Sequence, residues 1–85
     1  MTKSIVCIHE ETGLGVTVLA LEKEESWETV DGDSGSVLIG FEYRTDAGQP
    51  CRPDDDGVGL IVLALNGPVR VVPRNLMDLR RFPGF

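Results

Sequence analysis

Basic residues and long apolar runs are both scarce in this chain. Its 85 residues include 8 lysines and arginines against 14 aspartates and glutamates, which gives a formal net charge of −6. Proteins that bind nucleic acid through the phosphates need a basic face, so the composition argues against direct nucleic-acid binding. No apolar run approaches the ~18 residues of a membrane span. Met1-Thr2-Lys3 leads directly into a short strand, so we expect neither a membrane span nor a signal peptide.

Cysteine and histidine are also sparse. Cys7 and Cys51 allow one disulfide at most; Cys7 lies in an apolar strand, where a buried free thiol is usual, and Cys51 lies in a polar segment. His9 has no second histidine with which to chelate a metal, and the chain has no phosphate-binding glycine loop or paired cysteine ligands. We therefore expect free thiols, a reducing and cytoplasmic location, and no metal or other cofactor.

What the chain does have is a series of short apolar strands. With 41% hydrophobic and 26% charged residues its composition is that of a globular protein, and its length suits a single domain over residues 1–85. Turn residues and two polar connections, 23–36 and 45–57, separate the strands, and the second connection reads as a mobile surface loop. The pattern predicts an all-β fold of about five strands, and a small barrel is the economical architecture because closure removes exposed edges. The strands are expected at 4–9, 15–22, 37–44, 58–65 and after Gly67.

The strand 37–44 alternates in polarity. Val37, Ile39, Phe41 and Tyr43 are predicted to face the core, and Gly40 is predicted to mark a bulge or a close backbone approach.

The segment 58–72 reads as a β-hairpin. Asn66-Gly67 between two apolar runs predicts a type I′ turn that places Ala64 opposite Val69, although Pro68 has no N–H and leaves a wider loop open. The outer face is too apolar for full solvation, so it needs a cover from the same chain or from a second subunit. A homo-oligomer formed through the 58–72 hairpin is therefore one expectation. The residues on this face are Ile61, Leu63, Leu65 and Val72.

After Val72 the residue pattern changes from that of a strand to that of a short helical turn. Pro73 ends the strand, and Asn75 is placed to cap a helical turn that carries Leu76, Leu79 and Phe82. This order of strand, proline, asparagine and helical turn, over residues 67–79, resembles the closing segment of SH3-like barrels. The resemblance implies an SH3-like fold with a short C-terminal helical turn, of the kind found in accessory and adaptor modules.

Gly32-Asp33-Ser34-Gly35-Ser36 resembles the nucleophile motif of chymotrypsin-like serine proteases, with Ser34 as nucleophile and His9 upstream. That family builds its site between two barrels, this chain is long enough for one, and no aspartate suited to orienting the imidazole lies between His9 and Ser34. The motif is better interpreted as a turn that enters strand 37–44. We expect no enzymatic activity, and a serine hydrolase using Ser34 is a remote alternative.

Two acidic segments could in principle bind a cation. Asp31, Asp33, Gly35 and Glu42 have calcium-loop spacing, but Ser36 stands where an EF-hand needs glycine and a strand follows. A divalent site of another kind stays open there. In Asp54-Asp55-Asp56, successive carboxylates of an extended loop point in different directions, which favours a solvated acidic loop.

Trp27, the only tryptophan, lies in a segment rich in carboxylates. Aromatic anchors surrounded by charge are typical of protein interfaces, although Trp27 could equally cap one end of the barrel. The sequence predicts a partner-binding site for a protein with a basic surface, either as an accessory or adaptor module or as a phage or mobile-element inhibitor that blocks a basic nucleic-acid-binding surface. Its predicted residues are Glu22, Glu24, Glu25, Trp27, Glu28, Asp31 and Asp33, with Lys23 as the only opposing charge.

Overall fold

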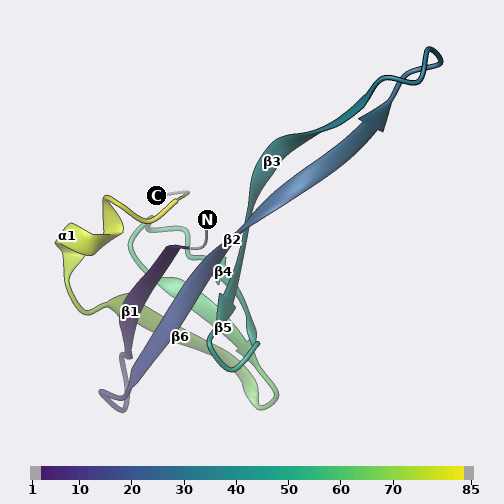
Figure 1. Ribbon diagram of the computed structural model, residues 1–85. Helices are drawn as coiled ribbons and strands as arrows, with labels where there is room; N and C mark the ends of the chain where they lie inside the picture. Colours follow the sequence, from purple (N-terminus) through teal and green to yellow (C-terminus); the bar gives the residue numbers. More distant parts are fainter. Residues whose placement is uncertain (1–2, 84–85) are drawn as a thin grey trace.

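The computed structural model describes residues 3–83, which form a closed antiparallel barrel. Each strand pairs with the next along the chain, and the last returns to pair with the first, as Figure 1 shows. This confirms the predicted all-β barrel, and it agrees at the level of the fold with an SH3-like barrel. The elements are β1 (Lys3–His9), β2 (Gly15–Glu28), β3 (Ser34–Thr45), β4 (Pro50–Pro53), β5 (Leu60–Ala64), β6 (Gly67–Pro73) and α1 (Leu76–Leu79).

The barrel has one strand more than predicted, because the connection 45–57 contains β4. This short strand joins Tyr43 and Arg44 of β3 on one side and residues 60–62 of β5 on the other. Without it the barrel could not close. In the described part of the chain, no helix is long and apolar enough to cross a membrane.

The core fills the barrel from alternate positions of its strands. Phe82, beyond α1, closes one end: its ring lies 5.6 Å from that of Tyr43, whose hydroxyl donates a hydrogen bond of 2.7 Å to the carbonyl of Pro83. The C-terminal segment is thereby fixed to β3. The buried hydrophobic residues are Ile5, Cys7, Val18, Ala20, Tyr43, Leu60, Val62, Val71 and Phe82.

The predicted register of the β5–β6 hairpin is wrong by two residues. Ala64 lies opposite Gly67 and Leu63 opposite Pro68, so Leu65 and Asn66 form the turn. Neither has a positive φ, and only Gly67 does (118°), so the turn is not type I′. In the predicted register Pro68 would flank the turn at a hydrogen-bonded position, where its missing N–H is costly. A shift of two residues avoids this and keeps each side chain on its predicted face.

The outer face of this hairpin is covered only in part. Ile61 lies between Arg52 of β4 and Arg70 of β6, whose aliphatic stems are suited to shield it. Leu63 is 45% exposed and Leu65 is fully exposed. Other residues of the same chain therefore cover part of this apolar face, which the sequence predicted to need a cover.

The C-terminal turn forms as predicted. The side chain of Asn75 accepts a hydrogen bond of 3.0 Å from the backbone N–H of Met77 and caps α1. Leu79 packs against the core beside the buried Phe82, whereas Leu76 is exposed. The hydrophobic contact with the barrel therefore comes from the end of this segment.

A two-stranded arm projects from the barrel. We define the arm as residues 22–40: the end of β2, a turn at 29–33, and the start of β3. The neighbours β1 and β4 reach only Ala20 of β2 and Tyr43 of β3, so among the described residues the arm strands pair only with each other. The molecule measures 56 × 30 × 22 Å, and its radius of gyration of 15.5 Å exceeds the about 12 Å expected of a compact chain of this length. Figure 1 shows the arm extending away from the barrel.

The arm corrects two predictions. The connection 23–36 is not a loop but mostly β-ribbon, and Val37 and Ile39 do not face the core but lie exposed on the arm. Only Phe41 and Tyr43 reach the core as expected. The sequence pattern failed here because neither face of a projecting ribbon is buried. The segment 23–28 therefore has no polar–apolar alternation, and the alternation of 37–44 does not mark a core face where that strand runs along the arm. Pairing that begins in the barrel simply continues outward.

Candidate functional site: the acidic arm and the arginine cluster

A β-bulge marks the base of the arm. Lys23 lies opposite Gly40 and Glu24 lies opposite Leu38, so Ile39 is the extra residue. Gly40 has φ 154°, a conformation that side chains rarely adopt, which confirms the predicted bulge at this glycine. Bulges bend a strand pair and increase its twist. The bulge is therefore positioned to set the direction in which the arm leaves the barrel.

The predicted acidic residues lie together on the arm, but on both of its faces. Side chains alternate along a strand, so Glu24, Ser26 and Glu28 share one face while Glu25 and Trp27 share the other. Ser36 of β3 donates a 3.2 Å hydrogen bond to Glu24 across the first face. Glu22 lies at the base opposite Phe41, and Asp31 and Asp33 lie in the tip turn. The acidic residues do not form a single face.

Trp27 lies on the arm, so the alternative that it caps the barrel is wrong. It pairs with Gly35 and is 48% exposed. A Cβ at Gly35 would lie 2.8 Å from Cζ2 of the indole, closer than real contacts allow, so only glycine lets the ring lie this close to β3. A shallow hollow beside the ring is lined by Ser26, Trp27, Glu28, Ser34, Gly35 and Ser36.

The tip of the arm is a compact turn held by Thr29. Its N–H donates to the carbonyl of Asp33 (2.8 Å), and its hydroxyl accepts from the N–H of Asp33 (3.2 Å). Gly32 supplies the positive φ of 88° that the turn needs. Val30, which follows Thr29 in the turn, is fully exposed.

The fold separates the residues of the protease-like motif, and it also separates the residues that have calcium-loop spacing. The predicted turn 32–36 is only partly a turn, because Ser34, Gly35 and Ser36 already belong to β3. Ser34 lies opposite Glu28 on the arm, whereas His9 ends β1 opposite Val71 in the barrel. Glu42, the last residue of calcium-loop spacing, lies below the arm and forms an ion pair of 2.6 Å with Arg44. It is not directed toward the tip turn that holds Asp31 and Asp33.

The arm also carries exposed apolar side chains. Val37, Leu38 and Ile39 are 52%, 49% and 57% exposed. None of the buried hydrophobic residues in the described chain belongs to the arm. Several exposed apolar side chains beside charged ones, here on both faces of the ribbon, are typical of a segment that contacts another molecule.

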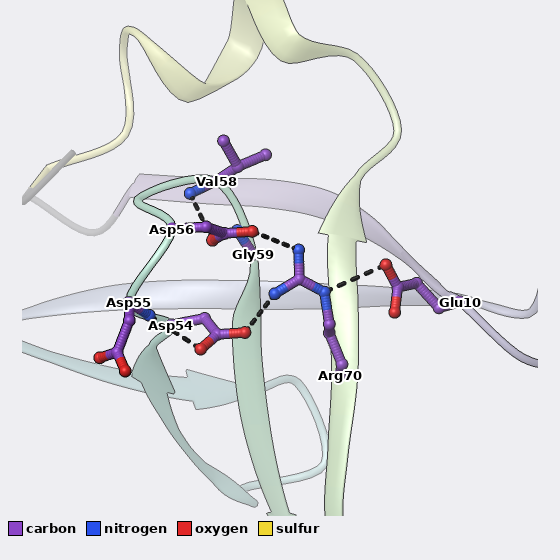
Figure 2. A network of polar contacts seen from close by, with 7 residues as sticks. All are labelled: Glu10, Asp54, Asp55, Asp56, Val58, Gly59 and Arg70. Carbon is purple, nitrogen blue, oxygen red and sulfur yellow. Dashed lines mark hydrogen bonds and ion pairs between the residues drawn. The ribbon is translucent and has the colours of Figure 1, made fainter.

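A second polar cluster centres on Arg70, as Figure 2 shows. Its Nε donates to Glu10 at 3.0 Å, and its two terminal nitrogens form ion pairs with Asp54 and Asp56. Gly59 makes room for it, because a Cβ there would lie 2.8 Å from the guanidinium carbon. The cluster joins β6 to the loop before β5 and to the turn after β1.

Asp56 is the best-bound carboxylate of this cluster. The hydrogen bond from Arg70, followed by those from the backbone N–H groups of Gly59 and Val58, holds the pKa of Asp56 well below its usual range. In turn, Asp56 and then Glu10 raise the pKa of Arg70. The prediction that successive carboxylates of this loop point in different directions is therefore wrong for Asp54 and Asp56, which converge on Arg70, although Asp56 stays exposed to solvent. Only Asp55 points away (Figure 2).

Sequence reasoning did not single out Arg70. The available signal was that it is the only charged residue in the segment 58–72, on a face that is otherwise apolar. An isolated charge of this kind usually has partners, and three carboxylates stood within reach in the loop before the strand.

The two thiols are free, and Cys7 is completely buried. Burial, and to a lesser extent the nearby Cys51, raises the pKa of Cys7 to about 11. A thiol of this kind is a poor nucleophile and serves as a core residue.

No protein-family model matches this chain, and comparison with curated proteins and with solved structures gives no match either. The protein is therefore described by its architecture, which is a small closed β-barrel with an acidic two-stranded arm that carries a tryptophan.

Proposed function

We propose that this protein is a non-catalytic protein-binding module, that its arm is the binding element, and that its partner presents a basic surface. One observation carries the proposal: a ribbon with carboxylates on both faces and at its tip projects beyond the barrel without a core of its own. Concentrated like charge costs stability through self-repulsion, and a basic partner offsets that cost.

The two faces of the arm have different roles in binding. Glu24 and Glu28 supply the electrostatic attraction that accelerates encounter, and Trp27 on the opposite face supplies an aromatic anchor. Because the two groups lie on opposite faces, the partner contacts both sides of the ribbon. A basic cleft suits this shape better than a flat basic surface.

The inhibitor form of the proposal draws on the same shape. A narrow ribbon that carries a row of carboxylates presents negative charge along a line, as a nucleic-acid strand does. A partner whose basic cleft normally holds nucleic acid would accept the arm in its place. Absence of catalysis is part of both forms, and the separation of Ser34 from His9 supports it. A cytoplasmic location belongs to the proposal as well, and the two free thiols support it.

Binding kinetics test the proposal. A partner is recovered from the native host by pull-down at low and high salt, and its association with purified variants is followed by surface plasmon resonance. Glu24→Lys with Glu28→Lys is expected to slow association about tenfold at low salt and to flatten the salt dependence. Trp27→Ala is expected to raise the dissociation rate about thirtyfold, the equivalent of roughly 2 kcal/mol for a buried anchor.

The matched control is Glu11→Lys with Asp55→Lys, which changes the net charge equally but on exposed residues of the barrel. It should leave association within about twofold of the wild type. Equal slowing by both pairs would mean that overall charge, and not the arm, governs binding. Competition by single- or double-stranded nucleic acid for the partner separates the inhibitor form from the adaptor form.

A further inference from the structure

The two edges of the arm differ sharply in charge. The β2 side carries Lys23 and a row of carboxylates, of which Glu24, Glu25 and Glu28 are exposed. The β3 side, residues 34–40, reads Ser-Gly-Ser-Val-Leu-Ile-Gly and contains no charged residue and no proline. Charge and proline are the usual means by which an exposed strand edge is kept from pairing with another chain. One edge of the arm is therefore protected and the other is not.

The backbone of the unprotected edge is directed outward at alternate residues. The bond from Thr29 N–H to the carbonyl of Asp33 makes those two residues a hydrogen-bonded pair. Pairs alternate along an antiparallel ribbon, so Ser26–Ser36 and Glu24–Leu38 are non-hydrogen-bonded pairs. The N–H and C=O groups of Ser34, Ser36 and Leu38 thus point away from β2 toward the open edge. They form a ladder of strand length that is ready for a further strand.

We propose that this edge pairs with the same edge of a second copy of the chain, antiparallel and across a two-fold axis. The result is a four-stranded sheet in the order β2, β3, β3 of the second copy, β2 of the second copy. This interface is distinct from the acidic partner surface and does not depend on it.

Charge selects the second copy as the occupant of this edge. Pairing β3 with β3 places no like charges opposite each other, because residues 34–41 are uncharged. Pairing β2 with β2 would set Glu24, Glu25 and Glu28 against the same carboxylates, which is destabilising. In the proposed sheet the two acidic strands lie at the outer edges, separated by both β3 strands. A basic partner, by contrast, would find no carboxylate on the edge itself.

The apolar side chains of the edge fit the same arrangement. Val37 and Leu38 lie on opposite faces of the ribbon and are each about half exposed, so the second copy's strand would cover part of both. A two-stranded ribbon is marginally stable by itself, and additional strands stabilise it. Dimerisation would thereby make the arm rigid and present two acidic strands on one sheet.

Proline substitution tests the pairing at a single backbone position on each edge. In Ser36→Pro the lost N–H is one that points to the open edge of β3, so pairing with β2 survives while strand addition is blocked. Ser26→Pro is the matched control, because Ser26 lies directly opposite and its N–H points to the other, acidic edge. Mass is measured by sedimentation equilibrium, and folding by far-ultraviolet circular dichroism.

We expect the wild type and Ser26→Pro to sediment at twice the 9.3 kDa of the chain. Ser36→Pro should weaken the dimer at least tenfold while keeping the β spectrum. Leu38→Lys should do the same by placing like charges at the interface, whereas Val30→Lys at the exposed tip should not. A wild-type monomer up to millimolar concentration would overturn the proposal. Equal dimerisation of both proline variants, or growth into open-ended assemblies, would overturn it as well.

Discussion

The arm should be removable without loss of the barrel. The perturbation replaces residues 24–39 with Asn-Gly, so that Lys23 and Gly40, which already lie opposite each other, flank a two-residue hairpin turn. None of the buried hydrophobic residues of the described chain lies in the deleted segment, and Phe41, which packs against the core, is retained. The packing that stabilises the fold is therefore untouched.

Loop length sets the expected magnitude. Shortening a connection from about sixteen residues to two is three halvings, and each halving lowers the closure cost by roughly 0.6 kcal/mol, or about 1.8 kcal/mol altogether. The deleted ribbon is itself only marginally stable, so little is lost in return. We expect the free energy of unfolding to be unchanged or to rise by no more than about 2 kcal/mol. Urea titration followed by circular dichroism measures it.

The same variant separates fold from function. It should lose dimerisation through the β3 edge and should no longer bind the basic partner, while its barrel stays intact. A loss of more than about 1 kcal/mol in unfolding free energy would refute the reasoning, since it would show that the arm contributes to the stability of the barrel.

Three further predictions concern the barrel. Phe82→Ala should lower the free energy of unfolding by about 3 kcal/mol or more and Phe82→Leu by less than ~1.5 kcal/mol, both measured with urea, because Phe82 is buried against Tyr43; equal small losses would mean that the C-terminal segment does not close the barrel. In Cys51→Ser, the remaining Cys7 should react with a disulfide reagent at pH 8 only as fast as the protein unfolds, because Cys7 is completely buried and burial also raises its pKa. Asp56→Asn should destabilise the protein at pH 6, and the difference in urea midpoint from wild type should shrink as the pH falls below about 3.9, the pKa of an unfolded aspartate. The sign follows from the lowered pKa of Asp56: the stabilisation is complete above the unfolded value and is lost as the pH falls toward the folded one. A constant difference down to pH 2 would contradict the ionic role of Asp56.

Local residue patterns predicted most strands of the barrel, but not β4, which lies in a polar connection. The strands β5 and β6 are short apolar runs bounded by glycine, proline and asparagine, and β1 is a short apolar run that ends at two glutamates. Such runs specify their own conformation. Asn75 and Phe82 fixed the closing turn in the same way, because a cap and the apolar residues that follow it act within a few residues of one another. Gly40 likewise indicated the position of the bulge.

Tertiary structure decided what is distinctive about the molecule. The charged segment 23–28 has no strand pattern of its own; it is a strand because pairing propagates from the barrel into β2 and β3, which a single sequence does not display. Trp27 over Gly35, and Arg70 among Glu10, Asp54 and Asp56, are contacts between segments that only closure of the sheet brings together. Composition located the acidic residues and the uncharged segment 34–40, but only the register of β2 against β3 made both segments strands of one ribbon, with the carboxylates on two faces of β2 and the uncharged residues along the opposite edge. Register is a property of paired strands, and no strand carries it alone.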